Sequence, residues 1–414
     1  MIKWMSLALV IAFIPSTWAL DTNSQTIVEE TLYQNFQQSI KTQDENKIKS
    51  SAGFSSFEQS LFVDALEDLA DEDSPAALEY LNNEAPFYYD LVQKLRIGIL
   101  RIKYKRAPFL PIELNNEIVN VLQTRSVELK IIYLIAAYEA ELTEAGHTEL
   151  IDLARTHPQY FDIKDDPSAI KEITEDMIAD IYHQNPDITT YMNGEYIKSV
   201  KIFMFCRNNR LYPCLMVMKN VLGEPVRLAD GTLWSNPSLA SSAKGLPSYS
   251  RNGNTPEGVL TIDSVMPTAD AQMSFGKFRR MVLNFIPKSK NEVLLKSLLP
   301  PSSQESDWWK AGVVSRDIGR NLLRIHGTGK INVDKETPYY PFMRTSGCIA
   351  QRENTYDGVT FKDQRNLLDS VMKAMDLAAS FENETHIKGL LYIVEIDDKN
   401  APVALEDLAV RGIE

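Results

Sequence analysis

The sequence predicts an α+β protein in which an all-helical N-terminal half is followed by a mainly-β half with one late helix. Apolar residues recur at helical spacing from about residue 20 to 195, as is typical of amphipathic helices. After Asn193-Gly194 the pattern changes to short apolar runs separated by clusters of Gly, Pro, Asn and Ser, which indicates strands and turns. A chain of 414 residues is long enough for two or three domains with cores of their own.

Residues 1–19 have the pattern of a secretory signal peptide. Lys3 supplies a positive charge, residues 4–14 form an apolar run, and small residues around Ala19 form a cleavage site. The run is too short to span a bilayer comfortably, and the sequence has no other long apolar segment. We therefore expect a cleaved signal peptide, a periplasmic protein and no stable membrane span.

The segment 20–195 is expected to be a helical domain. Ser55 and Glu58 have the spacing of a capping box, in which each residue satisfies a backbone N–H of the other at a helix start. A further helix should begin at Asp166-Pro167, where aspartate caps and proline takes the first helical position. Three more are expected at 86–105, 111–125 and 126–145, and the last is apolar enough to be the centre of the bundle.

The second half, 196–397, is expected to be a β-rich domain. Its first two strands are expected at 202–205 and 211–218, and a strand at 389–396 closes it. One amphipathic helix interrupts the strands at 363–380. The sequence does not predict the order of a C-terminal tail, 398–414.

Charge and cysteine content limit the kinds of function. The formal net charge of −13 argues against nucleic acid as a partner. Three cysteines in an exported chain leave at least one thiol outside an internal disulfide, either paired between chains or free for chemistry. Cys206 and Cys214 are close enough in sequence to bridge, but a turn at 208–209 would place Cys206 opposite Leu211, so the sequence leaves this bridge open. Cys348 has no obvious partner.

The segment Leu322–Arg352 carries one histidine and one cysteine, each beside glycine. His326 is followed by Gly-Thr-Gly, which should end a short buried strand in a turn, and Cys348 is preceded by Ser-Gly. A thiol has a free pKa of about 8.5, so it needs a base or a cation nearby to act as a nucleophile at neutral pH. We interpret Cys348 as nucleophile and His326 as base of an acyl-transfer enzyme. The structural alternatives, a small buried cysteine and a strand-end histidine, are less consistent with the flanking glycines.

The sequence resembles the L,D-transpeptidases with a YkuD-type catalytic domain. Three stretches in the expected order carry the resemblance, and it covers about residues 198–396: Asn254–Ile262 (NTPEGVLTI), Ile325–Thr328 (IHGT) and Thr345–Ile349 (TSGCI). It implies a YkuD-like, mainly-β catalytic domain that acts on peptidoglycan stem peptides. It also implies that Cys348 is the nucleophile, His326 the base and the carbonyl of Gly327 its orienting group. The N–H groups of Gly347 and Cys348 would form the oxyanion hole.

The sequence also departs from the family pattern. Ser346 stands where many members have histidine, and Ala350 and Gln351 follow where an arginine or asparagine is common. Arg344 and Arg352 are therefore candidates for binding a substrate carboxylate, with solvated surface arginines as the alternative. Tyr339 and Tyr340 could form a lid over the site or pack locally. Further substrate-binding candidates are Thr328 and Ser346.

We therefore expect a periplasmic L,D-transpeptidase of cell-wall biogenesis, active without metal or cofactor. It would form a Cys348 thioester with a tetrapeptide stem, release D-alanine and transfer the acyl group to an amine, giving a 3–3 cross-link or another product. If water is the acceptor, the same thioester makes an L,D-carboxypeptidase or endopeptidase. A third alternative is a non-catalytic peptidoglycan-binding scaffold. In each case the helical domain could bind protein partners.

Overall fold

A computed structural model describes residues 22–42, 54–71, 73–82, 89–104, 112–124, 127–144, 153–158, 160, 199–286, 291–299 and 308–413. The predicted signal peptide 1–19, the helix at Asp166-Pro167 and the domain boundary at 195/196 lie outside these residues. Within them the protein is α+β, as predicted. The chain divides into two compact units, residues 1–117 and 118–414.

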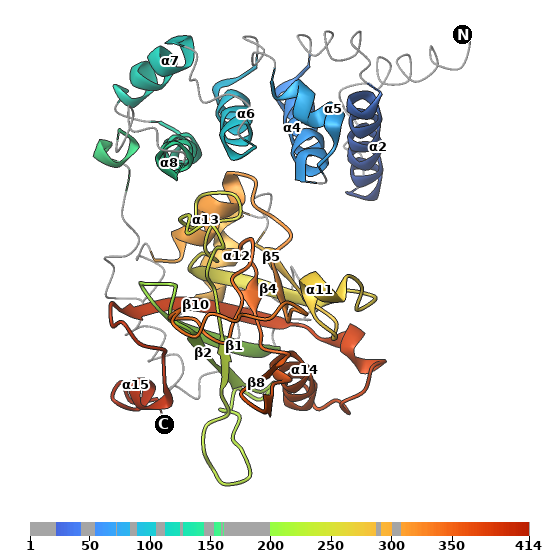
Figure 1. The fold of residues 1–414 in the computed structure, drawn as a ribbon, viewed down its shortest axis with the longest axis vertical. Helices are drawn as coiled ribbons and strands as arrows, with labels where there is room; N and C mark the ends of the chain where they lie inside the picture. Colours follow the sequence, from blue (N-terminus) through green and yellow to red (C-terminus); the bar gives the residue numbers. More distant parts are fainter. Residues whose placement is uncertain are drawn as a thin grey trace, which may run out of the picture. The chain divides into compact units, whose positions relative to one another are not determined.

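The first unit is built from helices around one apolar core (Figure 1). Phe62 and Leu66 of α4 are fully buried in this core. The predicted capping box is present, because the Ser55 N–H donates to the Glu58 carboxylate at 2.9 Å and the Glu58 N–H donates to the Ser55 hydroxyl at 3.3 Å. The helices of this unit are α2 (Thr22–Lys41), α4 (Ser56–Asp71), α5 (Pro75–Tyr80) and α6 (Leu91–Lys103).

The predicted helices between residues 86 and 145 are α6, α7 (Ile112–Leu122) and α8 (Leu129–Glu144). The carboxylate of Asp90 caps α6 by accepting the Gln93 N–H at 2.9 Å. α8 is buried over most of its length, as its composition predicted, but it belongs to the second unit and is not the centre of the first unit's helices. Its Tyr133 ring lies 5.5 Å from Tyr249, a residue of the loop before strand β4.

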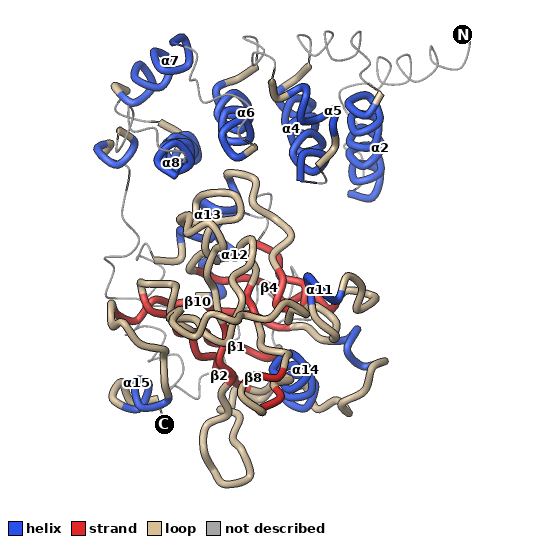
Figure 2. Tube along the Cα trace, viewed as in Figure 1, coloured by secondary structure: helices blue, strands red, loops and turns tan. Residues whose placement is uncertain are grey.

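A mixed eight-stranded sheet is the centre of the second unit (Figures 1 and 2). The strand order is β3-β2-β1-β10-β4-β5-β6-β7, in which the pairs β1–β10 and β6–β7 are parallel and the other pairs antiparallel. The strands are β1 (Val200–Arg207), β2 (Cys214–Lys219), β3 (Asn236–Ser238), β4 (Gly258–Val265), β5 (Met281–Phe285), β6 (Arg324–His326), β7 (Ile349–Ala350) and β10 (Gly389–Asp397), and β8 (Thr355–Tyr356) pairs with β9 (Val359–Thr360) outside this sheet.

Alternating side chains of the central strands fill two cores, one on each face of the sheet. One core contains Phe203 and Tyr392, together with Trp308 and Trp309 near α13 (Lys310–Asp317). The other contains Met204 and the apolar side of α14 (Asp363–Ala374). The short helices α11 (Gln272–Phe275) and α12 (Asn291–Leu298) precede and follow β5.

Two predicted segments differ from the structure in detail. The helix expected at 363–380 ends at Ala374, because Asp376 adopts a left-handed backbone with φ of 59°. The C-terminal residues 398–413 are ordered and contain α15 (Leu405–Ala409). Leu408 and Ile413 are buried in the same core as Trp308, so the sheet domain extends beyond its last strand.

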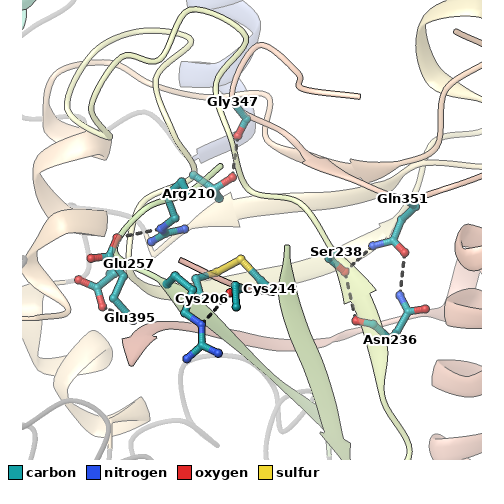
Figure 3. Close-up of a disulfide and its surroundings, with 12 residues drawn as sticks. Cys206, Arg210, Cys214, Asn236, Ser238, Glu257, Gly347, Gln351 and Glu395 are labelled. Carbon is teal, nitrogen blue, oxygen red and sulfur yellow. Dashed lines mark hydrogen bonds and ion pairs between the residues drawn. A yellow bond between two sulfur atoms is a disulfide. The ribbon is translucent and has the colours of Figure 1, made fainter. Parts of the chain in front are cut away.

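Cys206 and Cys214 form a disulfide at the end of the β1–β2 hairpin (Figure 3). Phe205 pairs with Leu215, so the same register places Cys206 directly opposite Cys214. The register predicted from a turn at 208–209 is therefore wrong. The connection runs from Asn208 to Pro213, which is longer than a two-residue turn.

Candidate active site

β6 and β7 bring His326 and Cys348 to neighbouring positions in the sheet. Ile325 pairs with Ile349 and His326 pairs with Ala350 in parallel register. Cys348 directly precedes β7, so the same register places it beside Arg324 of β6. Arg324 is two residues before His326 on that strand. The two predicted catalytic residues come from adjacent strands separated by a 21-residue insert, 327–347.

Cys348 is the free cysteine of the chain, since Cys206 and Cys214 are bonded to each other. Its Sγ lies 3.9 Å from the carbonyl oxygen of Leu322, to which the thiol donates. Burial raises the pKa of the Cys348 thiol, and the Arg324 N–H together with three guanidinium groups opposes that rise. Among the described residues, the hydrogen bonds of the thiol are made with the backbone of 322–324 rather than with the imidazole.

His326 is 4% exposed and held as a neutral imidazole. Its Nδ1 lies 2.5 Å from the Gly327 carbonyl oxygen, which fixes the proton on Nδ1 and leaves Nε2 as the basic nitrogen. Burial lowers the pKa of His326 to about 4, and the positive charges of Arg280 and Arg324 act in the same direction. Phe275 of α11 packs its ring at 84° to the imidazole, with centroids 5.1 Å apart. A neutral, oriented imidazole has the properties of a general base.

Arg320, which the sequence did not indicate, lies directly behind the Gly347-Cys348 turn. Its guanidinium donates to the carbonyl oxygens of Ser248, Gly253 and Asn254, so it fixes the loop before β4. Gly347 has φ of 102°, and a Cβ on it would lie 2.7 Å from the Arg320 Nη2. Glycine is therefore required at 347 both by backbone conformation and by this close approach.

The turn around Cys348 is also tied to its surroundings by hydroxyl groups. Thr255 donates to the Gly347 carbonyl oxygen at 3.0 Å (Figure 3, dashed line at Gly347). Thr345 donates to the Cys348 carbonyl oxygen at 2.6 Å. These bonds involve the carbonyl groups of the turn and not its N–H groups. The role of the Gly347 and Cys348 N–H groups as oxyanion donors stays a prediction.

Arg280 and Arg324 are two further cations that the sequence did not indicate. Met281 of β5 pairs with Ile325 of β6 in antiparallel register. Arg280, the residue before Met281, therefore lies opposite His326, the residue after Ile325. Arg324 and His326 are two residues apart on β6 and share the face opposite Ile325. Their spacing on one strand was the only signal in the sequence that could have associated Arg324 with the site.

The two arginines predicted to bind substrate have other contacts. Arg352 pairs with Asp363 through Nε at 2.5 Å, and its guanidinium carbon lies 4.1 Å from the Phe361 ring centroid. Arg344 lies over Tyr339 at 5.4 Å. These contacts give Arg352 a role in packing, and binding of substrate by either arginine stays a prediction.

The remaining predicted residues lie in the 327–347 insert and mostly pack it together. Thr328 is buried and donates to the Met273 carbonyl oxygen at 3.1 Å, which holds α11 against the turn after His326. Tyr340 donates to Asp357 at 3.1 Å, and Tyr339 packs on a small core that contains Phe342. Ser346 is exposed. Local packing, rather than a lid, describes the contacts of the two tyrosines.

Gln351 follows Cys348 by three residues, and its side chain is buried. Its side chain accepts from Asn236 and donates to Ser238, both at 2.7 Å (Figure 3). These two bonds attach β3 to the residue after β7. The amide of Gln351 is therefore used within the protein and does not face a ligand.

Glu353 is a buried carboxyl beside the histidine turn. A Cβ on Gly327 would lie 2.1 Å from its carboxyl carbon, so a larger residue at 327 would require the Glu353 side chain to move. Burial raises the pKa of Glu353 to about 7, against the opposing hydrogen bond from the Lys277 N–H at 2.6 Å. Within the described residues, its Oε1 atom has no hydrogen-bond partner.

Comparisons with known proteins do not identify a family. No protein-family model matches the chain, and no curated protein or solved structure matches it either. The described residues contain no group of three or more His, Cys, Asp or Glu side chains arranged to hold a metal ion. In the same part of the chain, no helix has both the length and the apolar character needed to cross a membrane.

Proposed function

We propose that the protein is a cysteine acyltransferase of the L,D-transpeptidase kind, which acts on peptidoglycan stem peptides in the periplasm. The observation that carries the proposal is the pairing of β6 with β7, which brings a free thiol near a buried, neutral histidine. The order of the TPEG, IHGT and TSGC stretches supports the substrate class. The described sheet is consistent with a β-rich catalytic domain.

The reaction follows from the protonation states of the two groups. The thiol and the imidazole are both neutral at rest, so the proton moves from Sγ to Nε2 of His326 as sulfur attacks the substrate carbonyl carbon. A C–S bond forms, the peptide C–N bond breaks, and the imidazolium returns its proton to the leaving amine. An amine acceptor then attacks the thioester, and the thiol is regenerated.

Direct proton transfer requires the Cys348 thiol to turn toward His326. In the structure the thiol donates to Leu322 rather than to the imidazole. Catalytic hydrogen bonds are often long in unliganded enzymes and shorten when substrate binds. A small rotation of the Cys348 side chain away from the β6 backbone would free it for His326.

Intact-mass measurement on the full chain tests the proposal. After incubation with a carbapenem, the wild-type protein should gain one covalent adduct, and Cys348→Ala should gain none. With disaccharide-tetrapeptide muropeptides, D-alanine release and a 3–3 linked dimer are expected.

The other outcomes of that experiment are informative in different ways. Tripeptide without dimer would show that water is the acceptor and that the enzyme is an L,D-carboxypeptidase. An adduct that persists in Cys348→Ala would remove this cysteine from the mechanism. A folded wild-type protein that gives neither adduct nor product would overturn the proposed function and favour a wall-binding scaffold.

A further inference from the structure

The charge around Cys348 is strongly one-sided. Arg280, Arg320 and Arg324 all act on the thiol electrostatically. Two of them are neutralised or occupied: Arg280 pairs with Asp270, and the guanidinium of Arg320 is committed to three backbone carbonyls. Arg324 differs from both.

Arg324 is a half-buried cation with much of its bonding capacity unused. Its Nη1 donates to the carbonyl oxygen of Leu323 at 2.6 Å, a neighbour in its own strand. Among the described residues, no carboxylate forms an ion pair with it. A guanidinium carries five N–H donors in a planar fork that fits a carboxylate with two parallel bonds. The free part of this fork has the chemistry of an anion-binding group.

The position of Arg324 relative to the nucleophile is fixed by strand pairing. The register Ile325 with Ile349 places Arg324 beside Cys348, and neighbouring strands lie about 4.8 Å apart. Its own N–H interacts with the thiol, and its charge acts on the same sulfur. Burial lowers the pKa of Arg324, while the Cys348 charge acts to raise it. Leu322, two residues earlier, is 60% exposed, so this end of β6 is open to solvent.

We propose that Arg324 forms a carboxylate-binding subsite next to Cys348, and that it, rather than Arg344 or Arg352, holds the anionic end of the acyl donor. The identification of the ligand as the donor's carboxylate rests on the proposed function. The subsite itself rests on the contacts of Arg324. Arg280 and Arg320 add to the positive field but are engaged within the protein.

Alkylation of Cys348 by two small reagents tests the subsite without reference to any enzymatic activity. Iodoacetate is an anion and iodoacetamide is its neutral analogue. The same Cys348 thiolate attacks the CH2 carbon of either reagent and displaces iodide, so the ratio of the two rate constants is independent of the thiol pKa. In the full chain at low salt, this ratio should exceed that of glutathione. In Arg324→Met and Arg324→Gln it should fall by about fivefold to tenfold, as expected for a lost charge-assisted contact at a partly exposed site.

Matched variants separate the subsite from general charge. Arg324→Lys should retain part of the preference for iodoacetate, and Arg227→Met, in the exposed loop between β2 and β3, should leave the ratio unchanged. Circular dichroism and melting temperature verify that each variant is folded. An unchanged ratio in both Arg324→Met and Arg324→Gln would overturn the proposal, as would a fall in Arg344→Met instead. Failure of both reagents to modify Cys348 would also overturn it.

Peptide donors then identify the ligand. A donor with a free terminal carboxylate should lose more kcat/KM in Arg324→Met than its terminal carboxamide does, because the effect of the lost charge on the thiol is common to both donors. If wild type consumes neither donor while the alkylation ratio still depends on Arg324, the subsite stands and the proposed function fails. Equal losses on both donors would exclude the carboxylate as the ligand of Arg324.

Discussion

At the scale of single residues, two opposing effects determine the chemistry of the thiol. Burial disfavours the thiolate, whereas three nearby guanidinium groups favour it. For the histidine the two effects act together instead of opposing each other, because both burial and the arginines disfavour its charged form. A resting thiolate–imidazolium pair is therefore disfavoured, and base catalysis by neutral His326 is the mechanism that this environment supports.

The lowered pKa of His326 determines the expected pH dependence of acylation. Since the pKa of His326 is lowered to about 4, the imidazole remains a competent base until the pH falls toward 4. The acid limb of kcat/KM for the acyl donor should therefore have its midpoint near pH 4 instead of near 6.5. His326→Ala should lower the rate roughly 10²–10⁴-fold. A midpoint close to 6.5 would mean that the imidazole is solvated in the working enzyme.

Glu353 should make the folded protein less stable as the pH rises toward 7. The folded protein holds its proton up to about pH 7, whereas the unfolded chain releases it near 4.5, so stability decreases as pH rises between these values. Glu353→Gln cannot ionise and retains an acceptor for the Lys277 N–H. The difference in melting temperature between variant and wild type should grow from pH 4.5 to 7 and then level off. A constant difference across that range would contradict the buried-carboxyl assignment.

The residues of the site differ in how visible they are in the sequence. His326 and Cys348 could be predicted because glycines flank them and three motifs occur in order. Arg320 and Arg324 could not, because their relation to Cys348 arises from loop closure and from the pairing of β6 with β7. Arg352 was predicted as a binding residue from its position after the cysteine, but Asp363, from the start of α14, pairs with it.

At the scale of elements, the β1–β2 hairpin is held by a disulfide as well as by the backbone hydrogen bonds between its strands. The disulfide joins residues eight apart in sequence, and closing a loop of this size stabilises a fold by about 2.5 kcal/mol in the chain-entropy model. The double variant Cys206→Ser, Cys214→Ser should lose about this amount in urea unfolding. Both cysteines are replaced together so that no new thiol can exchange with Cys348.

Carbapenem acylation supplies the control for the hairpin. The double serine variant should still form the adduct at Cys348, because β6 pairs with β5 and β7 and not with β1 or β2. Loss of the adduct from a folded double variant would show that the hairpin shapes the site. An unchanged unfolding midpoint would mean that the bridge adds no stability.

The elements themselves were predicted with uneven success, for identifiable reasons. The capping box, the apolar α8 and strands β1 and β10 follow from local pattern. The end of α14 could not be predicted from local pattern, because it depends on the left-handed backbone of Asp376. The end of the β1–β2 hairpin could not be predicted either, because it depends on a loop that the disulfide closes. The short buried strand predicted before His326 begins only at Arg324, because Leu322 is exposed and has a left-handed backbone with φ of 57°.

At the scale of the whole molecule, the C-terminal segment is part of the core on one face of the eight-stranded sheet. Leu408 is fully buried, whereas Val410, two residues on, is 79% exposed. Leu408→Ala should therefore cost about 2–5 kcal/mol of unfolding free energy. Val410→Ala should change it by less than about 0.5 kcal/mol. Chemical denaturation of both variants measures the difference, and equal small effects would show that the segment is not required for the fold.

Charged residues attach the same segment to the start of the sheet. Arg207, at the end of β1, is almost fully buried and pairs with Asp397 at 2.7 Å and with Asp407 at 2.5 Å. Hydrophobic pattern alone could not predict this, because Arg207 and Asp407 are 200 residues apart in the sequence and an ion pair over that separation leaves no local pattern. Three apolar residues of the segment, Val403, Leu408 and Ile413, are buried in the core of the sheet domain.

The pairing of the first strand with the last affects how the chain is made. β1 lies between β2 and β10, so before residue 397 is synthesised the sheet exists only as two separate groups of strands, β3-β2-β1 and β4-β5-β6-β7. Long-range pairings of this kind form late, since the intervening chain must be complete first. The eight-stranded sheet can therefore be completed only after β10 has been made, because this strand joins the two groups.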